Sequence, residues 1–511
     1  MKFDTIVIGS GMGGMTCASA LAHLNKKVLI LEQHYVAGGM THTFKRKGFV
    51  WDVGVHSIGE MEANRIPGRV FKWISDGNVN MVKYDEVYDT FNFPGGFKFE
   101  LPSDQHQLRK NLVEKFPDEV EAIDTYIEYI KAAAKTTMQH FAARTLPYMA
   151  ESLLAPFIKR KFNKWADRTT KEVLDSITSN DKLKAVLAGQ WGYYGATPSK
   201  SSFFIHALTV RHFWDGGFYP EGTSKVIAEN VLDSVTKNGG EVRVRASVSK
   251  LLMDGDTVIG VETEKGDKFY APIVISAIGA KATVEHLVPD KFQSDSWVKE
   301  IKSLVQTPCH LNLYLGFEGD VMKAGATKSS QWFFETWDME KALWDVLDPD
   351  SEAACLYASF ASTKDPAHDP GEKMKHTGEV ITFVPWEVFA KWDETTVRKR
   401  PEEYNKLKED IKARMMAQMT KHMPELMKLC VYSELSTPLS MTYYCRPPQG
   451  AIYGIDPTPK RWRSQSLRPK TPIKGLYMTG GDIGTLGLGG AMMGGIITAN
   501  KIDSRVMEKV K

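Results

Sequence analysis

Cysteine is scarce in this chain, and its arrangement excludes the common cysteine frameworks. The 511 residues contain 5 cysteines, and no two of them form a Cys-x-x-Cys pair. An odd number of scattered cysteines argues against a disulfide scaffold and against a structural zinc site. We therefore expect reduced, packed cysteines, no bound metal and a reducing compartment. Cys445 is the one thiol that lies within a motif of interest.

The chain also lacks an excess of charge and any long apolar run. Its 65 Lys and Arg against 62 Asp and Glu leave a net charge of +3, which argues against nucleic acid as a partner. No stretch of about eighteen apolar residues occurs, so no transmembrane helix is expected. The first apolar segment begins at Phe3, so we expect no secretory signal and a cytoplasmic location, with peripheral membrane association left open.

What the N-terminus does contain is a complete β-turn-α-β pattern. A short apolar run over residues 3–8 is followed by glycines at GxGxxG spacing, a helical stretch and a second strand, KVLILE. The glycines are Gly9, Gly11 and Gly14, and the second strand ends on Glu32. In this pattern the glycines allow a tight turn, close approach of a pyrophosphate and close helix packing, while the acid binds the ribose hydroxyls. The segment therefore predicts a dinucleotide site.

The residues after Glu32 favour FAD over NAD. The stretch QHYVAGGMTHTF holds a second glycine pair, and it resembles the E-x₅-GG-R/T pattern of glutathione-reductase and amine-oxidase flavoproteins. FAD needs additional close-approach backbone, which a glycine pair supplies. The residues expected to contact the cofactor here are Gly38, Gly39, Met40, Thr41 and His42.

Further along, helical patterns dominate residues 103–190, short strands dominate 241–278 and 305–390, and a helix is predicted at about 402–423. The tail runs from a strand, KGLYMTGGD, through a glycine cluster into a last helix. No second βαβ unit of this kind occurs, so we expect no nicotinamide domain, and an external electron donor or acceptor is required.

Several of these motifs together are similar to one family. GGFYPEGTSKVIAENVL, GLYMTGGD, EQHYVAGGMTHTFKRKGFVWDVGVHSIG and RPPQGAIYG resemble the retinol saturase-like members of the phytoene desaturase and carotenoid isomerase family of FAD-dependent oxidoreductases. The resemblance implies an α/β fold, in which a Rossmann-type FAD domain of the amine-oxidase and glutathione-reductase kind is interwoven with an α+β substrate domain. It implies that the FAD domain comprises 1–60, 215–285 and 430–511, and the substrate domain 61–214 and 286–429.

The resemblance also implies contacts for the rest of the cofactor. The backbone of Val248 would face adenine, and Gly481 with Asp482 would bind the ribityl or pyrophosphate part. The last helix would begin near Gly490-Ala491-Met492 and point its N-terminus at the flavin, where partial positive charge stabilises the reduced, anionic ring.

Candidate catalytic and substrate-binding residues follow from this interpretation. Saturating a double bond needs a proton as well as a hydride. We expect His56 to supply the proton, because histidine titrates in the useful range, with a packed core histidine as the alternative. Tyr453 is a second candidate donor or pocket wall. The aromatic residues that suit a flat polyene, or else plain core, are Trp191, Tyr193, Tyr194, Tyr443 and Tyr444.

One more stretch suggests a membrane partner. Residues 146–171 mix aromatic side chains, leucines and lysines, which is typical of a segment lying on an anionic membrane; a lid helix with a solvated basic face is the equal alternative.

For the function, saturation of a double bond in a polyene, isoprenoid or other lipid is the leading hypothesis. Cis–trans isomerisation, desaturation and a flavin-binding lipid carrier without catalysis are the alternatives.

Overall fold

The nucleotide-binding half is built around a five-stranded parallel sheet. The computed structural model describes residues 3–145, 157 and 160–510. The strand order is β19-β13-β1-β2-β9, with all neighbours parallel. The strands are β1 (Thr5–Ile8), β2 (Val28–Leu31), β9 (Glu241–Arg243), β13 (Ile273–Ser276) and β19 (Leu476–Met478). Their carboxyl ends meet at one edge of the sheet, which is where this class of fold binds ligands.

Both faces of this sheet are covered, because its short apolar strands alternate side chains between two cores. Val7, Ile30 and Ile275 contact one cluster, and Ile6, Leu29 and Val274 contact the other. The helices on the first side are α1 (Met12–Ala22), α2 (Ile66–Ile74), α11 (Lys225–Lys237), α20 (Gly487–Ile502) and α21 (Val506–Lys509). The second side carries β10 (Val248–Asp254), β11 (Thr257–Thr263), β12 (Lys268–Tyr270), α12 (Ala280–Ala282), the π-turn η5 (Thr283–Leu287) and α13 (Ser296–Lys302).

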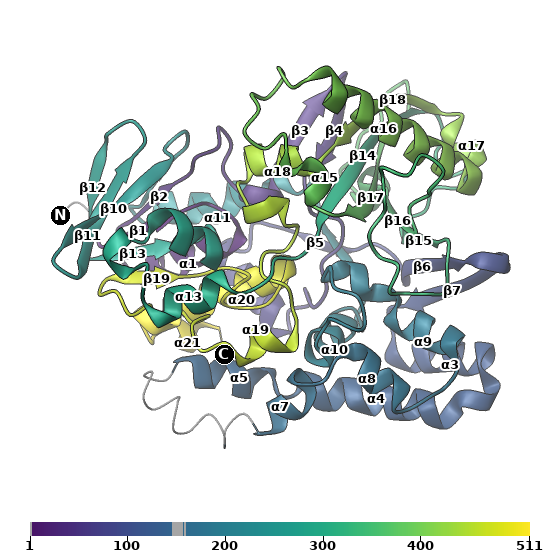
Figure 1. The fold of residues 1–511 in the computed structure, drawn as a ribbon, viewed down its shortest axis with the longest axis horizontal. Coiled ribbons are helices and arrows are strands. Elements are labelled where there is room, and N and C mark those ends of the chain that lie inside the picture. Colours follow the sequence, from purple (N-terminus) through teal and green to yellow (C-terminus); the bar gives the residue numbers. More distant parts are fainter. Residues whose placement is uncertain (1–2, 146–156, 158–159, 511) are drawn as a thin grey trace.

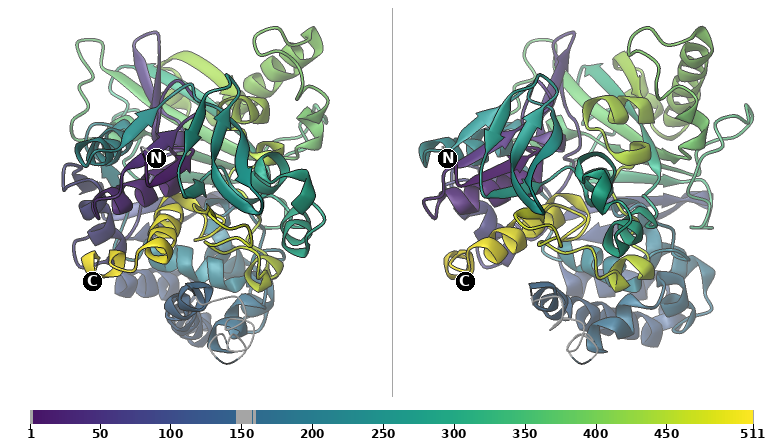
Figure 2. Two further views of the ribbon diagram at one scale, coloured as in Figure 1. Left: turned by 90° about the vertical axis from the view of Figure 1, so that its left-hand side faces the viewer. Right: turned by 60° about the vertical axis from the view of Figure 1, so that its left-hand side comes forward.

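The two ends of the chain meet in this half. Figure 2 shows the yellow C-terminal segment against the purple N-terminal strands, and α1 and α20 lie side by side. A Cβ on Gly495 would stand 2.7 Å from the carbonyl oxygen of Gly13, so glycine is what permits this close packing of the two helices.

The substrate half is built on a seven-stranded sheet of order β18-β14-β17-β16-β15-β6-β7 (Figure 1). Its strands are β6 (Val87–Phe93), β7 (Phe97–Pro102), β14 (Cys309–Glu318), β15 (Ser330–Phe334), β16 (Cys355–Ser359), β17 (Lys375–Val384) and β18 (Cys430–Ser436). One face is apolar and packs on α16 (Glu402–His422): Leu311, Leu313 and Leu315 point there. The opposite face carries the alternate residues of each strand.

Helices cover the far end of that second face. They are α3 (Gln105–Lys115), α4 (Val120–Ala134), α5 (Thr137–Thr145), α7 (Arg160–Ala166), α8 (Thr170–Asp175), α9 (Asp181–Ala188), η4 (Gly189–Tyr193) and α10 (Phe203–His212). The proposed membrane segment 146–171 falls partly outside the described residues. Within α7, Phe162 and Trp165 are buried in the helical core, so these two residues are not available to a membrane. No helix in the described ranges is long and apolar enough to span a bilayer.

Shorter elements connect these layers. They are η1 (Gly39–Thr41), β3 (Thr43–Arg46), β4 (Phe49–Asp52), β5 (Met81–Lys83), η2 (Pro94–Gly96), η3 (Pro117–Glu119), β8 (Phe218–Pro220), η6 (Asp290–Phe292), α14 (Ala361–Lys364), α15 (Glu387–Ala390), α17 (Pro424–Met427), α18 (Pro438–Tyr444), η7 (Pro448–Gly450) and α19 (Pro459–Arg463).

Three of the predicted domain boundaries differ from the structure. β18 pairs with β14 in the substrate sheet, so the last nucleotide-binding segment begins after Ser436 and not at 430. The residues of α2 and of α13 pack into the two cores of the nucleotide sheet, although both were assigned to the substrate domain. Amphipathic helices carry no signal for which sheet they cover, so the sequence alone does not assign α2 and α13 to either sheet.

Candidate active site

Glycines bring three distant loops together at the carboxyl edge of the nucleotide sheet. Gly9 has a φ of +93°, and a Cβ on Gly14 would stand 2.2 Å from the Gly9 carbonyl oxygen. A Cβ on Gly13 would stand 2.3 Å from the Cα of Gly480. The turn after β1 therefore lies directly against the C-terminal glycine cluster, and a side chain at Gly13 would separate the two.

The same loops leave an open hollow. A Cβ added to Gly11, Gly480 or Gly487 would meet no heavy atom of the described chain within 4 Å. Gly11 is the N-cap of α1, and Gly487 is the first residue of α20. Two helix N-termini with free N–H groups thus have open space beside them, which we call the glycine hollow and which suits the phosphates and ring of a dinucleotide.

Glu32, directly after β2, links the two glycine loops through hydrogen bonds. Its carboxylate accepts hydrogen bonds from the Ser10 amide (2.9 Å), the Ser10 hydroxyl (2.6 Å) and the His34 amide (2.8 Å). The Ser10 hydroxyl in turn accepts a hydrogen bond from the Gly38 amide at 2.9 Å. Glu32 is therefore held in place by the chain itself, at the position from which it would reach a ribose.

The Gly38–Gly39 pair packs against the first glycine turn. A Cβ on Gly39 would stand 2.9 Å from the Cα of Gly11. Thr41 donates its hydroxyl hydrogen bond back to the Gly38 carbonyl at 2.8 Å. His42 is buried with its Nδ1 2.5 Å from the Gly39 carbonyl, and burial lowers the pKa of its imidazole. His42 thus secures the loop.

Met40 lies within the second glycine loop, and Val248 begins a strand near Glu32. The sulfur of Met40 is 3.6 Å from that of Cys445, and burial raises the pKa of the Cys445 thiol to about 12, so this cysteine is unreactive at neutral pH. Val248 begins β10 two residues after Ala246, whose amide donates to the Glu32 carbonyl at 2.8 Å. Its backbone is therefore close to the ribose end of the hollow.

Asp482, which was expected to bind the ribityl or pyrophosphate part of the cofactor, has hydrogen-bond partners within the protein. Its two carboxylate oxygens accept hydrogen bonds from the Ala280 amide (2.8 Å) and the Ile455 amide (3.0 Å). The buried guanidinium of Arg461 donates to the Gly481 carbonyl at 2.5 Å. In this arrangement the Asp482 side chain fastens protein segments to one another, and the neighbouring Gly480 backbone is what borders the hollow.

The last helix also begins earlier than predicted. α20 starts at Gly487 and not near Gly490, so the free N–H groups are those of residues 487–489. Ala491 lies in the second turn, and Met492 is fully buried in the nucleotide-side core. Glycine has a poor helix propensity, which is why the sequence hides the first turn of this helix.

A row of polar side chains crosses the second face of the substrate sheet. Strand register places Tyr314 opposite Glu379, Glu379 opposite Ser359, and Ser330 opposite Asp89. All five are buried. Directly paired residues share a face of the sheet, so the five belong to one line running across β14, β17, β16, β15 and β6.

Lys364 reaches this row from α14. Its ammonium group donates three hydrogen bonds of 2.9 Å, to the hydroxyls of Ser330 and Ser359 and to the carbonyl of His56. Burial lowers the pKa of Lys364 to about 8 and raises the pKa of Asp89 to about 8. All three donors of an ammonium group are therefore used within the protein.

His56 lies between the nucleotide core and the polar row. Its neighbours Val55 and Ile58 pack into the nucleotide-side core, while its ring contacts Tyr357 at 5.6 Å between centroids. Burial, the charge of Lys364 and the proximity of His310 lower the pKa of His56 to about 3. Contrary to the expected titration near neutrality, this imidazole is neutral at pH 7.

The polar row has unpaired buried atoms around His56. Nδ1 of His56, Nδ1 of His310, Oδ1 of Asn312 and Oε1 of Glu379 have no hydrogen-bond partner in the part of the chain that the structure describes. Oε2 of Glu379 accepts a hydrogen bond from the side-chain amide of Asn312 at 2.9 Å and lies 3.9 Å from Nε2 of His56. Buried polar atoms without partners are rare in stable cores, and a bound water or ligand is one way to satisfy them.

The aromatic candidates divide into three places. Trp191 packs on Phe383, at 5.0 Å between centroids, and Tyr193 packs on Trp332 while its hydroxyl donates to both oxygens of Asp89. These two residues therefore lie on the face with the polar row. Tyr194 turns away, because its hydroxyl bonds Nδ1 of His206 at 3.1 Å within the helical core.

Tyr453 belongs to the same hydrophobic cluster as Trp191 and Tyr193, whereas Tyr443 and Tyr444 lie outside that cluster. The ring of Tyr453 packs on Gly195, where an added Cβ would stand 3.2 Å away, and burial raises its pKa. Tyr443 is 53% exposed, and Tyr444 contacts His34 on the nucleotide side at 5.5 Å between centroids.

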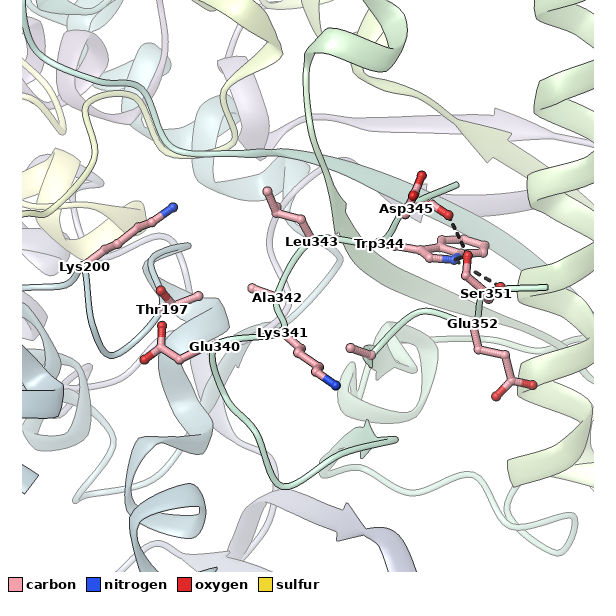
Figure 3. A pocket seen from close by; sticks show the side chains of 11 residues that line it. Thr197, Lys200, Glu340, Lys341, Ala342, Leu343, Trp344, Asp345, Ser351 and Glu352 are labelled. Atoms are coloured by element: carbon pink, nitrogen blue, oxygen red, sulfur yellow. Dashed lines mark hydrogen bonds between the residues drawn. The ribbon is translucent and has the colours of Figure 1, made fainter. Parts of the chain in front are cut away.

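A surface cavity of about 390 Å³ is shown in Figure 3. It is bordered by Thr197, Lys200, Glu340 and the loop around Trp344, whose indole donates to the Ser351 hydroxyl at 2.9 Å. None of its lining residues belongs to the glycine loops or to the polar row, so it is separate from the candidate site.

The sequence reasoning missed four residues of the site: Asp89, Lys364, Glu379 and Arg461. A signal existed for the strands, because HLNLYLGF alternates polar with apolar residues although the whole strand is buried. A strand with polar residues on one buried face needs partners for them. Lys364 and Arg461 lie on short helices without a periodic pattern, and no comparable signal marked them.

Comparison with known proteins identifies the class. The signature of the family described as flavin containing amine oxidoreductase matches residues 12–502, and the chain belongs to this family. Over 529 residues the chain is 31% identical to all-trans-retinol 13,14-reductase of Danio rerio, covering 98% of this chain and 86% of the relative. It is 22% identical to the chloroplastic prolycopene isomerase of Arabidopsis thaliana over 505 residues, covering 94% of this chain and 78% of the relative.

A solved structure supports the same fold. The cyclohexylamine oxidase from Brevibacterium oxydans IH-35A superposes with a TM-score of 0.62 at 13% identity, covering 99% of both chains. The predicted fold and the predicted family are thereby confirmed: within the flavin-containing oxidoreductases the chain is a retinol saturase-like enzyme. A flavin is its cofactor, and the glycine hollow described above fits such a group.

Proposed function

We propose that this chain is an FAD-dependent enzyme that saturates a carbon–carbon double bond of a hydrophobic polyene, isoprenoid or other lipid. The observation that carries the proposal is a row of buried, proton-bearing groups next to His56, in a chain that also has the glycine loops and is similar over its length to all-trans-retinol 13,14-reductase. Bound FAD would supply the hydride for one carbon of the double bond. The protein must then supply a proton to the other carbon.

We assign the adenosine and pyrophosphate parts of FAD to the turn of Gly9, Gly11 and Gly14, the Glu32 carboxylate and the Val248 backbone. The Gly38–Gly39 pair, with Met40, Thr41 and His42, would cover the pyrophosphate. The free N–H groups at the start of α20 would face the flavin ring, where positive potential favours the reduced form. These roles rest on the open space at Gly11 and Gly487.

His56 would pass the proton to the substrate. Its imidazole is neutral at pH 7. It can therefore give the proton on one ring nitrogen to the substrate only if another group donates a proton to the other ring nitrogen. Tyr453, whose phenol stays protonated, would be the second donor or a wall of the pocket. Trp191 and Tyr193 would stack on a flat polyene.

An isomerase is the second candidate, and the similarity to prolycopene isomerase favours it. Desaturation is the reverse reaction on the same site. All three reactions require a hydrophobic substrate, and the two redox reactions require an external electron donor or acceptor.

One experiment separates these functions. The FAD-loaded protein is photoreduced without oxygen, incubated with all-trans-retinol or a carotenoid, and the products are weighed by mass spectrometry. A gain of two hydrogens supports the saturase, and an unchanged mass at a new retention time supports the isomerase. A loss of two hydrogens, seen with the oxidised protein, indicates a desaturase. Tight lipid binding without any product under all conditions would leave only the carrier.

A membrane surface is the proposed partner for part of 146–171. Phe157 is 81% exposed, and Arg160, Lys161 and Lys164 are exposed beside it. Apolar and basic side chains together favour an anionic interface. Flotation with vesicles of anionic lipid tests the idea, and failure to float at low salt would contradict it.

A further inference from the structure

The proton that saturation consumes must come from a group next to His56, and Glu379 lies in the right place. Its Oε2 is 3.9 Å from Nε2 of His56, and its Oε1 has no partner among the residues that the structure describes. Resting catalytic contacts are often longer than those in the reacting complex, so this gap is one that a small rotation or one water molecule closes.

The groups around Glu379 come from every element packed on it. Asp52 of β4 and Lys364 of α14 act on its charge, Asn312 donates to it from β14, and Tyr314 and Tyr219 face it. Burial is the largest influence, and it raises the pKa of Glu379 well above its usual range. Burial therefore favours the protonated form of the carboxyl group, which is the form that has a proton to give.

A cavity open to solvent reaches Asp52, whose charge acts on Glu379. It has a volume of about 640 Å³ and is lined by Asp52, Tyr219, Asp365, Lys375 and Thr377 among others. Thr377 and Glu379 alternate along β17 and share a face of the sheet. Glu379 thus lies one step inward from the cavity wall, next to Asp52, and water in the cavity can return a proton to it.

We infer that Glu379 is the proton store of the enzyme and acts through His56, with the Asp52 cavity as its route to solvent. In the transfer the O–H bond of Glu379 breaks and an N–H bond forms at Nε2 of His56. The Nδ1–H bond of His56 breaks as a C–H bond forms on the substrate. Glu379 is left as a carboxylate and regains a proton through the cavity. The inference rests on the proposed function, which supplies the hydride.

The test compares two glutamates of one register row. Glu379 and Glu434 are both opposite Tyr314, on its two sides, but Glu434 is exposed by 39% and Glu379 by 2%. Glu379→Gln keeps an oxygen for Asn312 and removes the acidic proton, whereas Glu434→Gln is the matched control. The photoreduced, FAD-loaded proteins are mixed with all-trans-retinol without oxygen, and the single-turnover rate is followed by flavin absorbance.

We expect Glu379→Gln to slow the single turnover by about 10²–10⁴-fold, the usual effect of losing a proton donor, with Glu434→Gln within about twofold of the wild type. We also expect formate to restore part of the rate in Glu379→Ala, which opens a space, but not in Glu379→Gln. Equal rescue of Glu379→Ala by formamide, which has no acidic proton, would overturn the inference, because it would indicate a space-filling role.

Two further outcomes remain decisive. If Glu379→Gln turned over as fast as the wild type, the inference would be overturned while saturation remained intact. If the wild-type protein added no hydrogen to any polyene, the proposed function itself would be refuted. If Glu379→Gln does not retain flavin, infrared difference spectra of the wild type replace it. They should show the carbonyl band of a protonated carboxyl group vanishing during the turnover, and a band that stays constant would contradict the proton store.

Discussion

Replacing Gly11 or Gly13 with alanine tests two different roles of the glycine turn. We expect Gly11→Ala to disturb cofactor binding and Gly13→Ala to disturb protein packing. A Cβ on Gly11 would meet nothing of the described chain within 4 Å, and the φ of Gly11 is −61°, which alanine adopts freely. A Cβ on Gly13 would stand 2.3 Å from the Cα of Gly480 and 2.8 Å from its nitrogen. Alanine therefore fits the first site and collides with backbone at the second.

The magnitudes follow from these distances. Carbon atoms pack at about 3.5 Å or more, so Gly13→Ala must push α1 and the Gly480 loop apart by about 1.2 Å. Overpacking of this kind costs about 1–3 kcal/mol of the free energy of unfolding. Gly11→Ala should change that free energy by less than about 0.5 kcal/mol. Its methyl group occupies the hollow, so we expect the Kd for FAD to rise at least tenfold, or about 1.4 kcal/mol.

The assay uses flavin-free protein. Urea unfolding measures the stability of the wild type, Gly11→Ala and Gly13→Ala, and quenching of FAD fluorescence measures the Kd of each. If Gly11→Ala unfolded as early as Gly13→Ala, or bound FAD as tightly as the wild type, the assignment of the hollow to the dinucleotide would be refuted.

Three further predictions concern the polar row and a distant surface pair. His56→Ala should lower product formation by about 10²–10⁴-fold with unchanged flavin absorbance; unchanged turnover, measured by mass spectrometry, would remove His56 from the mechanism. Lys364→Met removes the hydrogen bonds to three buried acceptors, of which the Ser330 hydroxyl keeps a second partner, Tyr357, and should cost about 1–3 kcal/mol of stability in urea unfolding. It should also raise the pKa of His56, which the lysine charge lowers; an imidazole pKa that does not rise in NMR titration would refute this coupling. Hydrogen bonds, the strongest of them from His422, lower the pKa of Glu335 to about 2. The carboxylate therefore contributes to the free energy of unfolding above the ordinary glutamate pKa, and this contribution is lost as pH falls towards 2. Glu335→Gln should destabilise the protein at pH 7 but not near pH 2, and an equal loss at both pH values would contradict this.

Local sequence predicted the nucleotide half well because each of its signals is contiguous. The turn from Gly9 to Gly14, the strand ending on Glu32 and the final helix all follow from spacing within one βαβ unit or one helix. The helix start was misplaced by three residues because glycine hides it.

The polar row could not be derived in the same way. Asp89, Ser330 and Glu379 meet only through strand pairing between β6, β15, β16 and β17, and a one-residue change of register would turn each to the other face. The pKa of His56 was likewise unpredictable, because burial and Lys364 set it, and neither is visible in the residues around position 56.

The interleaving of the two sheets has a consequence for how the chain is made. β1, the first strand to leave the ribosome, is flanked by β13 and β2, and the sheet is completed only by β19, close to the last residue. β6 and β7 likewise wait for β15, more than two hundred residues later in the sequence. β1 can pair early with β2, and β6 with β7, but each pair lacks its other neighbouring strand until much later in synthesis, and pairing over such separations is slow. We expect that no fragment ending before β19 can hold flavin, and that chaperone demand during translation is high.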